Sequence, residues 1–322
     1  MATRSYDEVQ AEAMEHYQAQ DYAGALEILT REGDRFPEEA ANVLYLRSCM
    51  AARVGQPDLA LQILEDALNR GLWYGEQVMR ESPSWQPLQG LPAFERLAAV
   101  CKERQAAAQI GPDLRVLEPA DGCPAPAACP LFLALHGNAG TADSAIQGWR
   151  AVAAAGWRLV ALQSSQVGGV NAYLWNDQET AVRETAAQYA ELCDRYAVDP
   201  TRLVVAGFSL GGETALRIVL SGSIPAPAFI LLGPGGPMME TPAAWLPLIA
   251  QGAGRGVRGY VFLGERDNAV EQDAARRVVD LLNANGVPCG LEMLPNLGHA
   301  YPADFGPGIR RALAFVLPAP EA

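Results

Sequence analysis

A serine on a sharp turn between a strand and a helix is the residue of this sequence best suited to do chemistry. Ser209 lies in RLVVAGFSLGGETALRIVL (residues 202–220), where an apolar, β-branched run gives way to an amphipathic helical pattern. Gly207 and Gly211, two positions before and after it, leave room for the backbone to bend. Such a turn lifts the hydroxyl clear of the sheet, beside a helix N-terminus whose dipole favours an anion. The pattern predicts nucleophilic catalysis by Ser209.

A serine nucleophile needs a base to take its proton, and the sequence contains three histidines. His16 lies in a helical N-terminal region. His136 ends an apolar strand upstream of the serine. His299 follows the last predicted strand, in PNLGHAYP, where a loop at the carboxyl edge of a sheet can lean over the turn. Only His299 gives the chain order serine, acid, histidine, so we predict it as the general base.

An orienting carboxylate is expected in YVFLGERDNAV (residues 260–270). Asp267 lies in the turn after this strand, about thirty residues before His299. Glu265 and Asp273 are the competitors, but Glu265 is expected at the end of the strand and Asp273 on the solvated face of the next helix. We therefore predict Asp267 as the acid, an assignment that depends on His299 being correct.

The elements that must hold these residues are short apolar strands alternating with helices. Seven apolar runs begin near residues 113, 130, 158, 202, 229, 259 and 290, and helical patterns lie near residues 142–155, 177–196, 211–221 and 271–285. Strands buried on both faces and separated by helices of this length are typical of a mostly parallel sheet. The predicted fold class is α/β, with a doubly wound, mostly parallel sheet.

The first third of the chain differs in composition. Residues 1–110 contain 6 Gly and 5 Pro, whereas residues 111–322 contain 25 and 18. Helical patterns cover residues 6–20, 21–35, 38–54, 57–70 and 91–108. Aligning residues 20–29 with 55–64 superposes Ala25 on Ala60 and Leu29 on Leu64, a period of 35. We predict an all-α helical-repeat domain over residues 1–108 and a catalytic α/β domain over residues 109–322.

Four motifs in this order resemble the α/β-hydrolase superfamily, within it the serine esterases of the carboxylesterase/phospholipase and acyl-protein thioesterase type. They are LHGN (135–138), GFSLGG (207–212), GERDNAV (264–270) and GHAYP (298–302). The resemblance implies that Ser209, Asp267 and His299 form a catalytic triad. It also implies that the backbone N–H groups of Asn138 and Leu210 form the oxyanion hole, and that His136 braces the loop. The N-terminal period resembles the tetratricopeptide repeat.

A stretch at residues 233–256, GPGGPMMETPAAWLPLIAQGAGRG, is long and apolar enough to cover a pocket. Met238, Met239, Trp245 and Leu246 within it, and Trp175 in a loop before a helix, are candidate pocket residues. Ordinary packing is the alternative for all of them.

Composition excludes several classes. Half of the residues are hydrophobic and the net charge is -13, which predicts a globular protein and disfavours nucleic-acid binding. An acidic N-terminus and no long apolar run predict a cytoplasmic protein without a membrane span. The six cysteines show no C-x-x-C pair, so no metal site or disulfide framework is predicted. Cys123 and Cys129 could pair on oxidation, but two free thiols are the preferred interpretation.

The predicted function is a cofactor-independent serine hydrolase acting on small to medium carboxylic esters. An acyl thioesterase and a dipeptidyl-type peptidase are alternatives, because one triad serves all three reactions. A scaffold whose N-terminal helices bind a protein partner or self-associate is the alternative from another class. The acidic face of those helices, with 17 acidic against 10 basic residues in 1–110, is interpreted as solvated surface.

Overall fold

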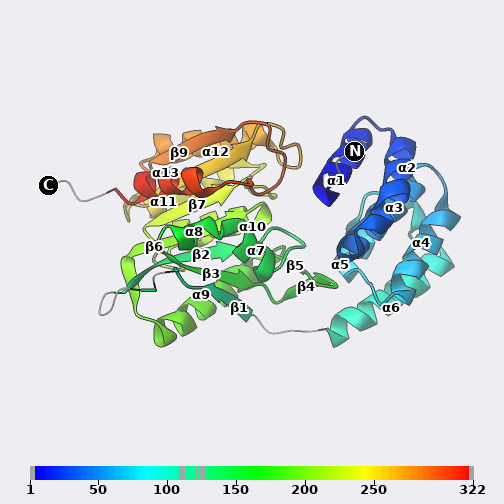
Figure 1. Cartoon of the computed structure of the whole chain (residues 1–322), viewed down its shortest axis with the longest axis horizontal. Coiled ribbons are helices and arrows are strands. Elements are labelled where there is room, and N and C mark those ends of the chain that lie inside the picture. Colours follow the sequence, from blue (N-terminus) through cyan, green and yellow to red (C-terminus); the bar gives the residue numbers. More distant parts are fainter. Residues whose placement is uncertain (1–3, 109–112, 121, 124–127, 319–322) are drawn as a thin grey trace. The chain divides into compact units, whose positions relative to one another are not determined.

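A computed structural model describes residues 4–108, 113–120, 122–123 and 128–318 (Figure 1). The chain divides into two compact units. The helical unit comprises Met1–Gln109 and Val167–Val170, and the sheet unit comprises Ile110–Gln166 and Asn171–Ala322. The predicted boundary between residues 108 and 109 adjoins residues 109–112, which lie outside the described residues.

Local capping chemistry defines the helices of the helical unit. The Ser5 hydroxyl accepts the Glu8 N–H, the Glu8 carboxylate accepts the Ser5 N–H, and Asp21 caps the second helix through Gly24 N–H. The α-helices are α1 (Tyr6–Gln18), α2 (Tyr22–Glu32), α3 (Ala40–Arg53), α4 (Pro57–Asn69), α5 (Glu76–Glu81) and α6 (Pro92–Ala107). Short 3₁₀ turns η1 (Gly33–Arg35), η2 (Pro37–Glu39) and η3 (Gln86–Leu88) lie between them.

The 35-residue register recurs in the packing of these helices. Ala25 on α2 and Ala60 on α4 are both fully buried, and Leu29 and Leu64 are buried in the same way. The Ser48 hydroxyl donates to the Ala60 carbonyl, so α3 and α4 approach closely at that small residue. Residues at equivalent positions of the period are therefore buried in both helices. The resemblance to the tetratricopeptide repeat itself stays a prediction.

Seven strands form the sheet of the sheet unit and confirm the predicted fold class. Their order is β1-β3-β2-β6-β7-β8-β9; β1 pairs antiparallel with β3, and every other pairing is parallel. The strands are β1 (Asp113–Leu117), β2 (Cys129–Leu135), β3 (Arg158–Gln163), β6 (Val198–Phe208), β7 (Ala228–Leu232), β8 (Arg258–Gly264) and β9 (Cys289–Leu294). Because neighbouring strands run parallel, the carboxyl ends of β2, β6, β7, β8 and β9 all lie along the same end of the sheet.

Helices cover both faces of this sheet, and alternation along the strands separates two cores. In β2, Leu131, Leu133 and Leu135 face one core, whereas Phe132 and Ala134 face the other. The first core packs against α9 (Gln178–Arg195), α10 (Leu210–Ser221), α11 (Leu246–Ala253) and α12 (Gln272–Ala284). The second packs against α7 (Ala142–Trp149), α8 (Ala151–Ala154) and α13 (Gly306–Val316). Both faces are therefore apolar, as continuous apolar strands require.

Several elements were not predicted from the sequence: α5, α11, α13 and a small two-stranded sheet of β4 (Gln166–Gly169) and β5 (Ala172–Leu174). Residues Val167–Val170 belong to the helical unit, where Gln105 Nε2 donates to the Val167 carbonyl at 2.7 Å. Glycine-rich VGGV lacks strand signals, which explains the omission. None of the described helices combines the length and apolar character needed to cross a bilayer.

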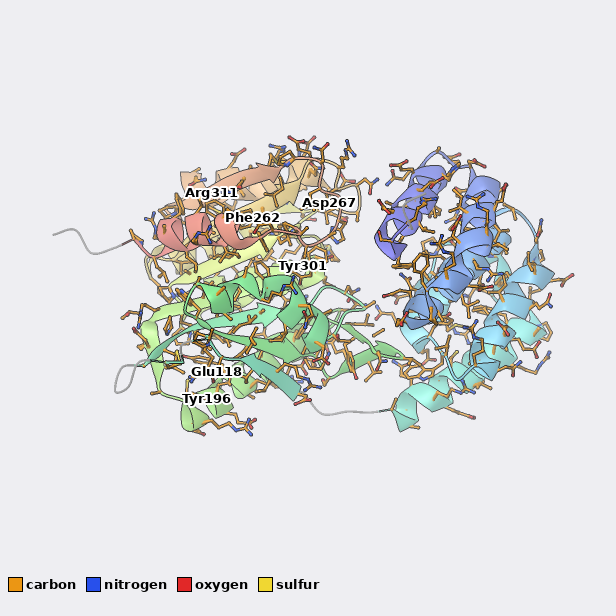
Figure 2. The ribbon with its side chains drawn as sticks, in the orientation of Figure 1. Glu118, Tyr196, Phe262, Asp267, Tyr301 and Arg311 are labelled. Atoms are coloured by element: carbon orange, nitrogen blue, oxygen red, sulfur yellow. A yellow bond between two sulfur atoms is a disulfide. The ribbon has the colours of Figure 1, made fainter. Side chains whose placement is uncertain are left out.

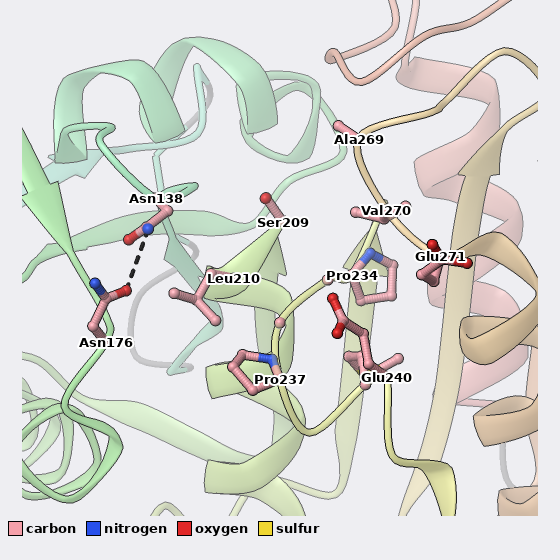
Figure 3. Close-up of a pocket in the computed structure, with 13 residues that line it drawn as sticks. Asn138, Asn176, Ser209, Leu210, Pro234, Pro237, Glu240, Ala269, Val270 and Glu271 are labelled. Atoms are coloured by element: carbon pink, nitrogen blue, oxygen red, sulfur yellow. Dashed lines mark hydrogen bonds between the residues drawn. The ribbon is translucent and has the colours of Figure 1, made fainter. Parts of the chain in front are cut away.

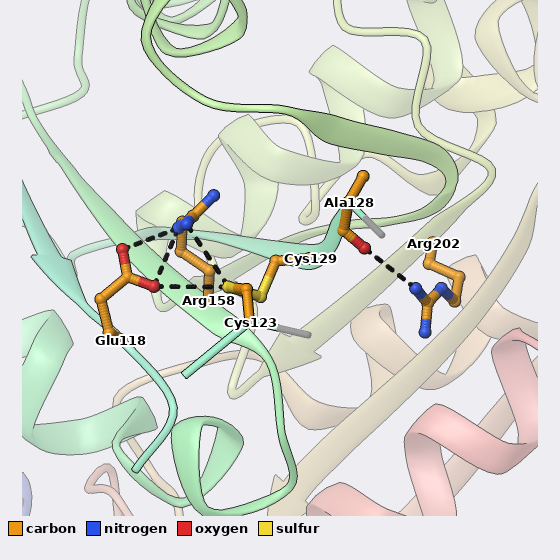
Figure 4. Close-up of a disulfide and its surroundings, with 6 residues drawn as sticks. All are labelled: Glu118, Cys123, Ala128, Cys129, Arg158 and Arg202. Atoms are coloured by element: carbon orange, nitrogen blue, oxygen red, sulfur yellow. Dashed lines mark hydrogen bonds and ion pairs between the residues drawn. A yellow bond between two sulfur atoms is a disulfide. The ribbon is translucent and has the colours of Figure 1, made fainter. Parts of the chain in front are cut away.

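Cys123 and Cys129 form a disulfide, which corrects the preferred interpretation of two free thiols (Figure 4). Their Cα atoms are 5.3 Å apart, within the range a disulfide requires. Arg158 stabilises the region around the disulfide. Its guanidinium pairs with Glu118 at 2.9 Å and lies 4.2 Å from the centroid of the Tyr196 ring. Spacing in the sequence could not reveal this, since pairing depends on how the intervening loop folds. Persistent disulfides are typical of oxidising compartments, so the redox state of this pair in cells tests the predicted cytoplasmic location.

Candidate active site

Ser209 occupies the turn between β6 and α10 with a strained backbone. Its φ of 55° and ψ of -128° lie in a region that residues with a side chain rarely adopt. The flanking glycines make the turn possible by close approach: a Cβ on Gly207 would overlap the Gly211 carbonyl, and one on Gly211 would overlap the His136 carbonyl. The backbone is therefore packed so tightly that no other residue fits at either glycine.

Asp267 and His299 come together at the carboxyl ends of β8 and β9. Asp267, labelled in Figure 2, follows β8 and is 3% exposed. Its carboxylate lies 2.8 Å from His299 Nδ1. Its other oxygen accepts the Ala269 N–H at 3.1 Å, which fixes the orientation of the carboxylate. Gly233, at the end of β7, has a φ of 48°, and a Cβ there would lie 2.9 Å from the Asp267 carboxylate. The pair thus needs a residue without a side chain at Gly233.

The ring of Phe208, the residue before Ser209, contacts the imidazole of His299. Among the described residues, no hydrogen bond joins the Ser209 hydroxyl to the His299 imidazole. Phe208, directly before the serine, stacks on the His299 ring with centroids 4.6 Å apart and planes tilted by 31°. Catalytic hydrogen bonds are often open before substrate binds, so this arrangement keeps the histidine as a candidate base.

Two backbone N–H groups beside Ser209 are free to bind an oxyanion. Within the described part of the chain, neither the Leu210 N–H nor the Asn138 N–H donates a hydrogen bond. Leu210 begins α10, where N–H groups have no partner inside the helix. The Asn138 side chain is held by Trp175 N–H and by Asn176, both at 3.3 Å. Both predicted oxyanion residues therefore present unused donors next to the serine.

His136 is buried beneath the oxyanion loop as a neutral ring. Its Nδ1 lies 2.8 Å from the Gly137 carbonyl and donates to it, while Nε2 faces two donors, Gln163 Nε2 at 3.1 Å and Ser164 N–H at 3.4 Å. Burial lowers the pKa of His136 to about 4. Trp175 stacks on the ring at 4.7 Å and donates from Nε1 to the His136 carbonyl. These contacts fix the start of the loop that carries Asn138.

A cavity of about 280 Å³ opens at Ser209 (Figure 3). Ser209, Asn138 and Leu210 line it together, so the three residues that the triad and oxyanion assignments require around the substrate border one space. Its other walls come from Asn176, from the loop after β7 and from the loop after β8; the loop residues are Pro234, Gly235, Gly236, Pro237, Met239, Glu240, Ala269, Val270 and Glu271. Two carboxylates and no cationic side chain line this cavity.

Solved structures share this architecture. A crystal structure of an uncharacterized protein from Bacillus cereus ATCC 10987 matches with a TM-score of 0.55 and 21% identity, over 97% of this chain and 99% of that one. Esterase PE8 matches with a TM-score of 0.52 and 21% identity, over 64% of this chain and 98% of that one. The S-formylglutathione hydrolase from Agrobacterium tumefaciens matches with a TM-score of 0.50 and 18% identity, over 63% and 89%.

The sheet unit has the α/β-hydrolase fold. Residues 5–109 match the family model described as "A/B hydrolase-like, N-terminal domain", so the helical unit is similar to that domain. No curated protein matches the sequence. The α/β-hydrolase fold expected from four sequence motifs is thereby confirmed.

Three of the predicted pocket residues, Trp175, Met238 and Trp245, lie behind the cavity wall. Trp175 is fully buried under the oxyanion loop. Trp245 is also fully buried and donates from Nε1 to the Met238 carbonyl, while the Met238 sulfur accepts a hydrogen bond from Arg217. None of the three is among the residues that line the cavity. Met239, also a predicted pocket residue, does line the cavity, whereas Leu246 is exposed and does not.

One group of described residues has the composition of a metal site, Glu118 with Cys123 and Cys129. Both sulfurs belong to the disulfide, whereas metal binding by cysteine requires thiolates. This group therefore does not suit a metal while the disulfide is intact.

Proposed function

We propose that this protein is a serine hydrolase that cleaves small to medium carboxylic esters. The observation that carries the proposal is the hydrogen-bonded pair of Asp267 and His299, which lies at the same sheet edge as Ser209 and stacks on its neighbour Phe208. The similar structures include an esterase and an S-formylglutathione hydrolase, which fits the same class of reaction.

In the proposed reaction, Ser209 Oγ attacks the ester carbonyl carbon while His299 Nε2 takes the hydroxyl proton. Nδ1 is already hydrogen bonded to Asp267, which orients the ring for this transfer and stabilises its charged form. For this transfer, His299 Nε2 has to come within hydrogen-bond distance of Ser209 Oγ when the substrate binds. The Asn138 and Leu210 N–H groups donate hydrogen bonds to the oxyanion, each contributing about 3 kcal/mol in such sites.

The tetrahedral intermediate then collapses and the alcohol leaves with the proton from His299. Water enters the site, gives its proton to His299 and attacks the acyl-Ser209 ester. Release of the carboxylic acid returns the proton to the serine. The cycle uses only side chains and backbone groups of this chain.

Labelling with a fluorophosphonate, followed by mapping of the modified residue, tests this proposal. We expect modification at Ser209 and none in Ser209→Ala, which should also lose hydrolysis of p-nitrophenyl acetate and butyrate without a lower melting temperature. Ser221→Ala, at the other end of α10, is the matched control and should react like the wild type. Wild-type protein that is inert to both esters and to the probe would refute the proposal.

The proposed preference for oxygen esters over acyl thioesters and aminoacyl amides is tested with matched substrates. The same acyl group is presented as an ester, a thioester and an amide, and kcat/KM is compared. Faster turnover of the thioester or amide would move the assignment to the thioesterase or peptidase alternative.

We also propose that the helical unit binds a protein partner or a second copy of the chain, in a cytoplasmic protein. The support is the paired arrangement of α1 to α4, in which small buried residues bring helices together and leave their outer faces exposed. Light scattering of the full chain across a concentration series measures self-association. A monomer at every concentration, with no partner recovered by cross-linking in cells, would contradict this role.

A further inference from the structure

Glu213 is a buried carboxylate that the proposed reaction does not use. It lies on α10, four residues after Ser209, and only 1% of it is exposed. Removing a carboxylate from water is costly, and burial raises the pKa of Glu213 accordingly. A buried acid at this distance from a nucleophile needs a structural or chemical reason.

The contacts of Glu213 point to the loop after β7. One carboxylate oxygen, Oε2, accepts the Met238 N–H and the Met239 N–H, each at 2.9 Å. Gly236 packs directly on the same group, because a Cβ there, at a φ of 143°, would lie 2.5 Å from Oε2 and 2.6 Å from Leu210. A single side chain on the nucleophile helix therefore holds three positions of this loop.

Two of those positions, Gly236 and Met239, belong to one wall of the cavity. Pro234, Gly235, Gly236, Pro237, Met239 and Glu240 all line the space in front of Ser209 (Figure 3). The Ser209 carbonyl accepts the Gly235 N–H at 3.2 Å, so the near end of the wall is attached to the turn itself. Its far end, at Met239, is attached through Glu213.

We propose that Glu213 is a positioning residue that sets the substrate preference of the cavity by fixing this wall. The proposal rests on the proposed esterase function, since it assigns the wall to binding of the acyl or alcohol group. Losing the two hydrogen bonds frees Met238 and Met239, so Met239 no longer defines the depth of the cavity. Discrimination between substrates of different length then weakens, while the nucleophile and its oxyanion donors keep their own contacts.

Two variants at Glu213 separate the effect of its hydrogen bonds from the effect of its side-chain size. Glu213→Gln keeps an oxygen that can accept both N–H groups, whereas Glu213→Met keeps the length and removes the acceptor. We expect the butyrate-to-acetate ratio of kcat/KM to change about tenfold in Glu213→Met, mostly through KM, and by less than about twofold in Glu213→Gln. Labelling of Ser209 by a small fluorophosphonate should stay within about threefold of the wild-type rate in both.

Hydrogen exchange measures the wall independently of catalysis. Peptides covering residues 233–240 should lose protection in Glu213→Met and keep it in Glu213→Gln. If Glu213→Met does not fold, Gly236→Ala pushes the same wall away from Oε2 and should change the ester ratio in the same direction.

Three results would overturn the proposal. They are unchanged protection in Glu213→Met, lost protection with an unchanged ester ratio, or equal loss of both esters together with slower labelling. A wild-type protein that neither cleaves esters nor labels would instead refute the esterase function, and the inference with it. The two failures are therefore distinguishable.

Discussion

Acid should weaken the sheet unit through His136, whose ring is buried in its neutral form. Its pKa of about 4 lies below the ordinary value near 6.5, so the unfolded chain binds this proton more tightly than the folded one. The neutral ring therefore makes its full contribution to the free energy of unfolding above about pH 6.5, and this contribution is lost as pH falls toward 4. The difference amounts to about 3 kcal/mol in total, of which about 2 kcal/mol is lost between pH 7 and 5.

Native-state hydrogen exchange of peptides covering β2, which ends beside His136, measures this loss. After correction for intrinsic exchange rates, protection should fall about 30-fold between pH 7 and 5 in the wild type. His136→Asn removes the titrating ring. It should lower protection at both pH values, and the fall in protection between pH 7 and 5 that comes from His136 should be absent. His16→Asn, in the helical unit, is the control and should keep the wild-type dependence. Equal pH dependence in the wild type and His136→Asn would refute the reasoning.

Three further predictions concern the site. Asp267→Asn should lower kcat for p-nitrophenyl butyrate by about 10⁴-fold with unchanged circular dichroism, because an amide no longer holds His299 in the required tautomer; a loss under tenfold would contradict the assigned role. Gly137→Ala places a methyl group 2.9 Å from the ring that precedes the nucleophile, so the oxyanion loop must shift and kcat should fall about 10²-fold, as steady-state kinetics would show. Combined Glu240→Gln and Glu271→Gln should lower the preference for a choline ester over its neutral 3,3-dimethylbutyl analogue by about fivefold, because these two carboxylates line the cavity. An unchanged ratio at low salt would show that neither carboxylate contacts the substrate.

Local chemistry explains why the sequence predicts so much of this fold. An apolar run such as residues 203–208 is stable inside a sheet that is covered on both faces, and that is where this part of β6 lies. Gly207 and Gly211 mark a close backbone approach that admits no side chain, which identifies the turn at Ser209. Chain order and the common edge of parallel strands were then enough to bring Asp267 and His299 together, although their roles stay predictions.

The wall of the cavity was decided by tertiary structure alone. Met238 and Met239 are adjacent and chemically identical, and only Met239 lines the cavity. Which of the two does so depends on contacts with Glu213, Arg217 and Trp245, of which Glu213 and Arg217 lie outside the loop. Hydrophobic periodicity and turn signals describe how a segment relates to its own neighbours in the chain. The orientation of an irregular loop is instead set by groups distant in sequence, and a single sequence does not contain those distances.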